Sequence, residues 1–236
     1  MKFLRSLIHL ALGVCLTAAA AEAVMHPLRQ REQWQFEDPA VWEWQGQGSE
    51  TALVLKKPSQ YKPKYRRPFN MAWYGGAEWD SFTLTCEARL DAFTKGNNDV
   101  CIAFGGAGDS QFYYAHLGEK ADGVHLQLHV VNNADRKAIT TNRAETLPWK
   151  PGHWHSVKLV RDAASGSIKV WFDGLLVLEA SDKTFGKGRI GLGSFDDLGA
   201  FRNVSVIPGT AASAEASSSQ ASGTAFKPAA ENQRRP

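Results

Sequence analysis

Three consecutive segments near the C-terminal end of the chain constrain its fold most, and they span residues 154–162, 166–174 and 188–197. In the second segment, Ile168, Val170 and Phe172 alternate with Lys169, Trp171 and Asp173. This spacing of two residues places the apolar side chains on one face of an extended strand, where a core can bury them. Glycine-containing turns separate the segments, as in antiparallel hairpins. We therefore expect an antiparallel β protein.

Much of the remaining chain also has the pattern of short strands. They are expected within residues 36–44, 51–55, 69–73, 81–90, 100–104, 111–117 and 124–131. No stretch carries apolar residues at helical spacing over more than two turns, so helices should be minor. About ten to thirteen strands in one domain are too many for a small immunoglobulin-type sandwich. The sequence predicts an all-β fold, a two-sheet antiparallel jelly-roll sandwich in which one sheet presents a concave face.

The N-terminal residues have the layout of a cleavable secretion signal. Two basic residues precede an apolar stretch over residues 7–20, and a small-residue pattern ends at Ala23. The apolar stretch is too short for a stable membrane span. A lipoprotein signal with Cys15 as the lipidated residue is the alternative, but Val14 stands where a small residue is needed. We expect residues 1–23 to be removed and the protein to be secreted or periplasmic.

The C-terminal residues differ in composition from the rest of the chain. Residues 208–236 are rich in Ala and Ser and poor in large apolar residues, so burial cannot offset the entropy lost on ordering. We expect a disordered tail there. Residues 24–207 are then expected to form one jelly-roll domain, since this length suits a single sandwich core.

The charge of the chain limits the classes of partner. The formal net charge is +3 at pH 7, and it falls to about +1 without the expected signal and tail. Nucleic acids and anionic membranes need a concentrated basic surface, so neither is an expected partner. One basic cluster, at residues 56–57 and 62–67, is interrupted by prolines and is expected to form a solvated loop.

Two cysteines remain in the expected domain, Cys86 and Cys101. Export would permit a disulfide between them. Alternation places Cys86 on the buried face of its strand with Leu84, whereas Cys101 points away from the buried Val100 and Ile102. Their Cβ atoms should point apart unless a bulge shifts the register, which disfavours a disulfide.

Alternation in the middle strands also gathers polar and aromatic side chains on one sheet face. If the apolar residues of these strands are buried, the residues between them point the other way. The residues expected there are Asp99, Tyr114, His116, His125, Gln127 and His129, and Arg136 follows in the next loop. An aromatic ring, hydrogen-bonding groups of both kinds and imidazoles suit a polyhydroxylated sugar ring. We expect these residues to bind a carbohydrate or glycoside.

Two other interpretations of this face remain open. Antiparallel sheets often face water on one side, so the face is also consistent with an ordinary solvated surface. The histidines together with Asp99 offer zinc ligands, although their spacing matches no standard zinc motif. Three histidines on two neighbouring strands are unusual for a solvated face, which favours a ligand.

Further candidates lie outside this set. Trp171 is expected to point outward, where its ring can stack on a sugar. Asp196 and Asp197 either cap a turn, which is the favoured interpretation, or bind a cation. Arg136 either clamps a ligand or pairs with Asp135 in solvent. None of these residues requires a cofactor. A structural calcium ion is the one bound group that they are compatible with.

The sequence lacks the motifs of several hydrolase classes. It has no Glu-x-Asp-x-x-Glu strand, which many jelly-roll glucanases use for nucleophile and acid, and no Gly-x-Ser-x-Gly turn. It also has no His-Glu-x-x-His motif and no phosphate-binding glycine loop. A standard two-carboxylate glycosidase is therefore not supported.

Several segments resemble known jelly rolls. Those that resemble the C-terminal half of concanavalin A-like and laminin G-like jelly rolls are residues 154–162, 168–174, 182–185 and 188–197. More narrowly, they resemble a bacterial secreted group described as 3-keto-disaccharide hydrolase-like, formerly a domain of unknown function. Residues 67–70 and 112–117 are similar to segments of exported relatives of that group. The resemblance covers most of residues 36–207 and implies glycan-related work on a concave face, and it assigns no catalytic residue.

Three functions from different classes follow. The favoured one is an exported glycan-recognition domain that binds a carbohydrate on its concave sheet face. The second is a hydrolase or lyase acting on modified glycosides such as 3-keto-disaccharides, in which one of the three histidines acts as general acid or base beside Asp99. The third is a cell-envelope scaffold that uses the tail as a tether.

Overall fold

The computed structural model describes residues 23–91, 96 and 98–209. Nearly all of the expected secretion signal and of the Ala/Ser-rich tail lies outside the described residues. Four single-turn 3-10 helices are present in the described part of the chain, at Pro27–Arg29, Arg31–Gln33, Pro39–Val41 and Gly48–Glu50. None of these turns has the length or the apolar composition to cross a bilayer.

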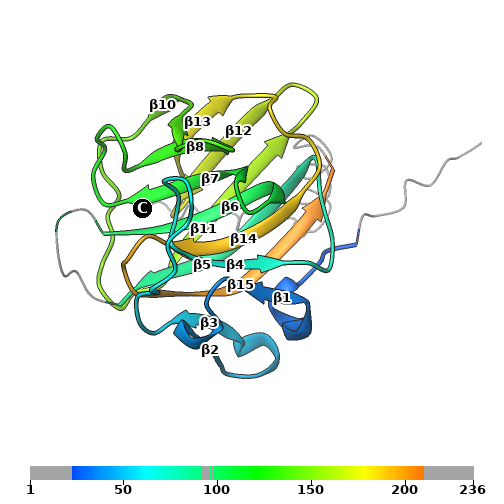
Figure 1. The fold of residues 1–236 in the computed structure, drawn as a ribbon, viewed down its shortest axis with the longest axis vertical. Coiled ribbons are helices and arrows are strands. Elements are labelled where there is room, and N and C mark those ends of the chain that lie inside the picture. The colour runs from blue at the N-terminus through cyan, green and yellow to red at the C-terminus, as the bar shows by residue number, and fades with distance from the viewer. Residues whose placement is uncertain (1–22, 92–95, 97, 210–236) are drawn as a thin grey trace, which may run out of the picture.

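The described residues form two antiparallel sheets that pack face to face (Figure 1). The seven-stranded sheet has the order β1 (Trp34–Phe36), β4 (Asn70–Tyr74), β14 (Arg189–Ser194), β6 (Asp99–Gly108), β7 (Gln111–Gly118), β8 (Gln127–Asn132) and β9 (Lys137–Ala138). The eight-stranded sheet has the order β10 (Thr140–Arg143), β13 (Leu175–Ser181), β12 (Ser167–Phe172), β11 (His155–Asp162), β5 (Phe82–Leu90), β15 (Gly199–Pro208), β3 (Ala52–Leu55) and β2 (Trp42–Gln45). The expected all-β sandwich with minor helix is confirmed.

The main core lies between the sheets, and alternation fills it from both sides. Leu84 and Cys86 of β5 belong to the same buried apolar cluster as Val100 and Ile102 of β6. Cys101 belongs instead to a second cluster, on the other face of the seven-stranded sheet. Both cysteines are free thiols, so the expectation that they do not pair is confirmed.

Some strand limits differ from the expected ones, for reasons of backbone conformation. The strand expected at 124–131 begins only at Gln127, because Leu126 has a φ of 49° and interrupts the extended chain. Strand β15 was not expected, although it pairs with both β5 and β3. A shift of register between Arg202 and Ser205, where Asn203 has a φ of 52°, breaks its alternation.

The outer face of the seven-stranded sheet is also buried. The second apolar cluster consists of Met71, Trp73, Cys101, Ala103, Phe112, Tyr114, Val131 and Phe195, with Phe69 packed against it. Phe69 ends the segment 56–69, which crosses in front of β6 and β7 in Figure 1. The expectation of an open face is therefore wrong, because strand periodicity does not reveal which distant segment covers a sheet.

A buried ion pair fixes this covering segment to the sheet. Both terminal nitrogens of Arg67 donate to the Glu37 carboxylate, at 2.7 and 3.0 Å, and the Arg67 side chain is only 1% exposed. The Tyr61 hydroxyl accepts from the same guanidinium at 3.3 Å, and the Trp73 indole donates to Glu37 at 3.3 Å. Burial raises the pKa of Glu37, although Arg67 opposes this rise. The pair is thus desolvated and depends on its hydrogen bonds.

Substituting Arg67→Ala should destabilise the fold. The change leaves the Glu37 carboxylate buried without its counter-ion, which typically costs about 3–5 kcal/mol. Urea unfolding followed by tryptophan fluorescence measures the loss, and Lys57→Ala, a substitution of an exposed cation on the same segment, is the control with almost no effect. A loss no larger than that of the control would contradict the anchoring role.

Candidate functional site

The strands β6, β7 and β8 bring the expected site residues together. Cys101 pairs with His116, which pairs with Gln127, and Tyr114 pairs with His129 on the same face. Asp99, which begins β6, lies beside His116. This shared face is the one that alternation predicts, because successive side chains of a strand point to opposite sides.

The remaining two residues of the expected set come from loops. The ring of His125, from the loop before β8, lies 5.0 Å from the ring of His116, measured between centroids. Arg136, from the loop between β8 and β9, donates to the Tyr114 hydroxyl at 3.4 Å and places its guanidinium 4.4 Å from the centre of the Phe195 ring. All seven residues are therefore in one place.

Most of this set is shielded from solvent. The buried members are at most 7% exposed, and they are Asp99, Tyr114, His116, Gln127 and His129. Only His125, whose side chain is 28% exposed, and the half-buried Arg136 reach the surface. A sugar cannot lie across the whole set without displacement of the covering segment.

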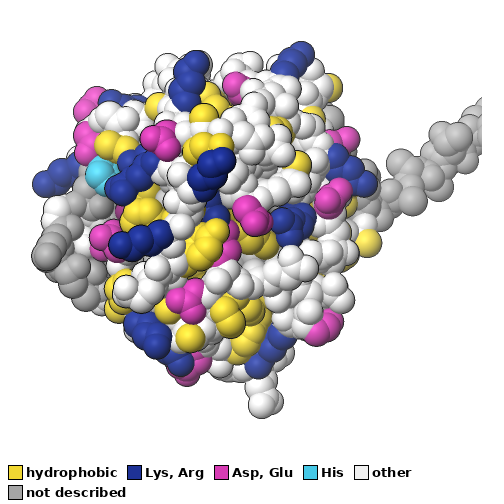
Figure 2. Space-filling model, viewed as in Figure 1, with side chains coloured by type: hydrophobic (Ala, Val, Ile, Leu, Met, Phe, Trp, Pro, Cys, Tyr) yellow, Lys and Arg dark blue, Asp and Glu magenta, His cyan; other side chains and the backbone are white. Residues whose placement is uncertain are grey.

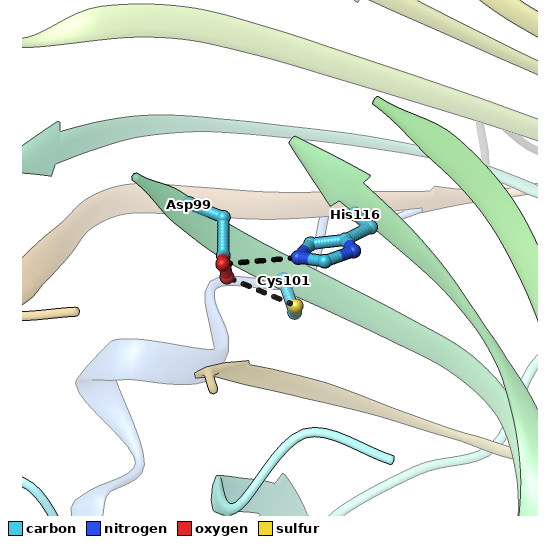
Figure 3. Close-up of side chains that lie close together, drawn as sticks. All are labelled: Asp99, Cys101 and His116. Carbon is cyan, nitrogen blue, oxygen red and sulfur yellow. Dashed lines mark hydrogen bonds and ion pairs between the residues drawn. The ribbon is translucent and has the colours of Figure 1, made fainter. Parts of the chain in front are cut away.

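Asp99, Cys101 and His116 form the centre of the buried set, and their side chains point toward one another (Figure 3). The Nε2 atom of His116 lies 3.0 Å from Oδ2 of Asp99, and the Cys101 thiol lies 3.7 Å from Oδ1. The other ring nitrogen of His116 lies 2.9 Å from the Val124 carbonyl oxygen. Burial is the largest influence on Asp99 and acts to raise its pKa, but His116, His125 and the Phe195 backbone together lower the pKa below its usual range.

A turn built on Asp122 places the Val124 carbonyl. The Asp122 carboxylate accepts from the backbone N–H groups of Val124 and His125, at 2.7 and 2.6 Å, and from the His125 ring at 2.7 Å. The Gln127 side chain donates to the Asp122 carbonyl at 2.8 Å. Two of the expected ligand residues therefore hold this turn in place.

His129 is buried beside this centre without a full set of partners. Its ring stacks on Tyr114, with centroids 4.9 Å apart and 12° between the planes. Its Nδ1 atom has no hydrogen-bond partner among the residues that the structure describes. Burial, together with the charges of His116 and Arg136, lowers the pKa of His129 to about 2. The ring is therefore neutral near pH 7, and its low basicity makes it a poor proton acceptor there.

Asp197 joins the site from the loop after β14. Its carboxylate accepts from the Asp99 backbone N–H at 2.8 Å, and its own N–H donates to the Ser194 hydroxyl at 3.1 Å. Burial and the charge of Asp99 raise the pKa of Asp197 to about 7. These contacts tie the loop to β6 and place the Asp197 carboxylate beside Asp99.

A groove that the sequence did not reveal lies on the covering segment. It has a volume of about 500 Å³ and is lined by Ser59, Tyr61, Lys62, Pro63, Lys64, Tyr65, Arg66 and Phe69. Figure 2 shows Lys and Arg side chains around hydrophobic ones on this face of the molecule. The basic cluster at residues 56–57 and 62–67, expected to be a solvated loop, therefore has two parts. Arg67 is a buried anchor, and other residues of the cluster line the groove.

The groove is joined to the expected site through stacked side chains. The guanidinium of Arg66 lies 5.0 Å from the ring centre of Phe69 and 5.4 Å from that of Phe195. The backbone N–H of Arg136 donates to the Arg66 carbonyl at 3.0 Å, and the Asp135 carboxylate accepts from the Arg66 N–H at 2.8 Å. The pairing of Arg136 with Asp135 is therefore not the contact that orders this loop.

A second, smaller surface site surrounds Trp171 on the outer face of the eight-stranded sheet. This half-exposed side chain points outward, as expected, and the Lys158 ammonium lies 4.1 Å from its ring centre. The adjoining pocket of about 290 Å³ is lined by Thr85, Cys86, Ser156, Val157, Lys158, Trp171 and Gly174. It offers a single aromatic ring and lies on the opposite side of the molecule from the groove.

Solved structures share this arrangement of sheets. The carbohydrate-binding module CBM66 from Bacillus subtilis is 18% identical, with a TM-score of 0.53 over 74% of this chain and 95% of its own length. A candidate glycosyl hydrolase from Parabacteroides distasonis is 14% identical, with a TM-score of 0.54 over 79% of this chain and 99% of its own. The chain has the concanavalin A-like jelly-roll fold.

A third structure supports the same assignment. A Bacillus subtilis protein of unknown function with a galectin-like fold is 17% identical, with a TM-score of 0.51 over 83% of this chain and 96% of its own. No protein-family model and no curated protein sequence matches the chain. At these identities the likeness establishes the fold alone, which hosts many unrelated functions.

Substituting His129→Phe should preserve stability. Phenylalanine keeps the stacking on Tyr114 and removes the unpartnered nitrogen, whose burial costs about 1–3 kcal/mol. In EDTA, which removes any bound metal ion, we expect a free energy of unfolding within about 1 kcal/mol of wild type. The slightly larger ring offsets part of the stability gained by removing the unpartnered nitrogen. His129→Ala, which leaves a cavity, should lose about 2–4 kcal/mol. A larger loss for His129→Phe than for His129→Ala would show that Nδ1 has a structural partner.

Proposed function

We propose that this chain is a carbohydrate-binding jelly-roll domain that takes its glycan in the groove over the seven-stranded sheet. The groove itself carries the proposal. It combines the rings of Tyr61, Tyr65 and Phe69 with the cationic groups of Lys62 and Arg66 in about 500 Å³. Aromatic rings stack on the apolar faces of sugars, while the surrounding donors bind hydroxyl oxygens.

The buried set of expected ligand residues supports the groove from below. Tyr114, His116 and Phe195 form part of the layer on which Arg66 and Arg136 stack. Arg136 and His125 are the two members that reach solvent, so they extend the proposed binding surface toward β8. One of the structural neighbours is named a carbohydrate-binding module, which makes sugars the first ligand class to test.

The proposal includes export of the protein. Residues 1–23 act as a cleaved signal, and the folded residues, whose last strand β15 ends at Pro208, form the binding domain. Glycan polymers outside the cytoplasm are then the natural ligands, and nucleic acids are not.

The N-terminal sequence of the secreted protein, read by Edman degradation or mass spectrometry, should begin near Val24.

Tyr61→Ala and Tyr65→Ala should each weaken glycan binding about tenfold. Each substitution removes one stacking ring, and tenfold corresponds to about 1.4 kcal/mol. A glycan array identifies the ligand and calorimetry measures its affinity. Trp171→Ala, which removes an aromatic ring from the opposite side, is the matched control and should bind normally. Equal affinity for all three variants, or loss confined to Trp171→Ala, would refute the groove as the binding site.

A second candidate function is a hydrolase or lyase acting on modified glycosides such as 3-keto-disaccharides. The observation in its favour is the contact between Asp99 and Asp197, whose pKa values are shifted in opposite directions, to below the usual range and to about 7. Carboxyl groups with separated pKa values can act as base and acid in one reaction. Asp99 is buried, so a substrate that reaches it requires the covering segment to move.

This second function predicts turnover that depends on Asp197. Over a panel of oxidised, uronic and unmodified disaccharides, Asp197→Asn should lower kcat at least about 100-fold while circular dichroism stays unchanged. Asp196→Asn, which changes the exposed neighbouring carboxylate, is the control. Absence of turnover by the wild-type protein over the whole panel would rule against an enzyme of this class.

A further inference from the structure

We propose that Asp99, Cys101 and His116 form a zinc-binding site. One oxygen, one sulfur and one nitrogen atom of these residues lie within 4.8 Å of one another, and all three side chains are buried (Figure 3). Carboxylate, thiolate and imidazole are the groups that bind zinc in proteins. The inference is independent of sugar binding, since the groove does not include these three residues.

The hydrogen bonds of His116 leave one ring nitrogen facing an acceptor. Nδ1 lies 2.9 Å from the Val124 carbonyl oxygen, which can only accept, so Nδ1 carries the proton of the neutral ring. Nε2 then presents a lone pair, and it lies 3.0 Å from Oδ2 of Asp99. Two acceptors at this distance repel each other unless a proton or a cation lies between them.

The direction of this contact favours a cation over a shared proton. Despite the short distance, Nε2 of His116 makes no hydrogen bond of acceptable geometry in the described part of the chain. A metal ion bound by both atoms accounts for the approach without requiring Oδ2 to lie along the N–H direction. A carbonyl that fixes the far nitrogen is also the usual support of a metal-binding histidine, since it sets the tautomer and the ring orientation.

The distances between the donor atoms suit a tetrahedral zinc ion. Bonds of about 2.0 Å to nitrogen and oxygen and about 2.3 Å to sulfur separate nitrogen from oxygen by about 3.3 Å and sulfur from oxygen by about 3.5 Å. The observed separations are 3.0 Å from Nε2 of His116 to Oδ2 of Asp99 and 3.7 Å from the Cys101 sulfur to Oδ1, the other oxygen of the same carboxylate. The three donor atoms lie within 4.8 Å of one another, so side-chain movements of about 1 Å would bring them to the separations of a tetrahedral site.

Charge balance points the same way. A carboxylate and a thiolate together cancel the two positive charges of zinc, so the occupied site is neutral and suited to a buried position. Calcium, the ion that the sequence left open, prefers six to eight oxygen ligands. The sulfur and nitrogen donors of this cluster therefore select zinc over calcium.

His129 supplies an independent indication of a bound group. Its Nδ1 atom is buried and unpartnered among the described residues, and the centre of its ring lies 5.9 Å from that of His116. A buried polar atom without a partner commonly marks a missing ion or water. Three protein ligands leave one position of a tetrahedral ion for a water molecule, which can also serve this nitrogen.

The test is metal analysis of the full chain with cysteine variants. The protein, purified without chelator, should contain about one zinc per chain by mass spectrometry, and cobalt substitution should produce a thiolate-to-cobalt charge-transfer band in the near ultraviolet. Cys101→Ser should abolish that band and weaken zinc binding at least about 100-fold. Cys86→Ser, which changes the other buried cysteine, should retain both.

A second measurement applies if Cys101→Ser does not fold. Zinc added to the chelator-treated wild-type protein should raise Tm, whereas calcium and magnesium should not. Protein without zinc and without a zinc-dependent rise in Tm would overturn the proposal. A charge-transfer band that persists in Cys101→Ser or disappears in Cys86→Ser would overturn it as well.

Discussion

The ion pair between Arg67 and Glu37 determines what the outer face of the seven-stranded sheet can do. Because this pair is buried and bidentate, it holds the segment 56–69 across β6 and β7 rather than leaving it in solvent. Two consequences follow from one contact. The outer face of β6, β7 and β8, which carries His116 and His129, becomes a closed region of low effective dielectric constant. The surface of the covering segment becomes a groove with aromatic walls.

The closed compartment changes the chemistry of the residues in it. On an open sheet face, Asp99 and His116 would form a weak, solvent-screened pair. Under the covering segment these groups are removed from water, and the same desolvation lowers the pKa of His129 and raises that of Asp197. The five buried residues of the expected set are therefore shielded from a polysaccharide by the covering segment, whereas an ion is small enough to lie among them.

The sequence correctly predicted which side chains share a sheet face, but it did not predict how deeply they are buried. Both outcomes have physical reasons. Period-two alternation placed Cys101, His116 and His129 on one face, since strand geometry is local. What covers that face depends on contacts between Arg67 and Glu37, thirty residues apart, which periodicity does not encode. Local exceptions have local causes. Leu126 and Asn203 adopt positive φ values, and each interrupts the alternation by which a strand is recognised.

The groove and the buried centre are mechanically coupled even though no residue belongs to both. The Asp99 carboxylate accepts from the Phe195 N–H, and Asp197 in the same loop accepts from the Asp99 N–H. Phe195 in turn carries the guanidinium groups of Arg66 and Arg136 at the edge of the groove. An ion that fixes Asp99 therefore also fixes the ring on which the groove rests, and a rigid floor lowers the entropy that a glycan loses on binding.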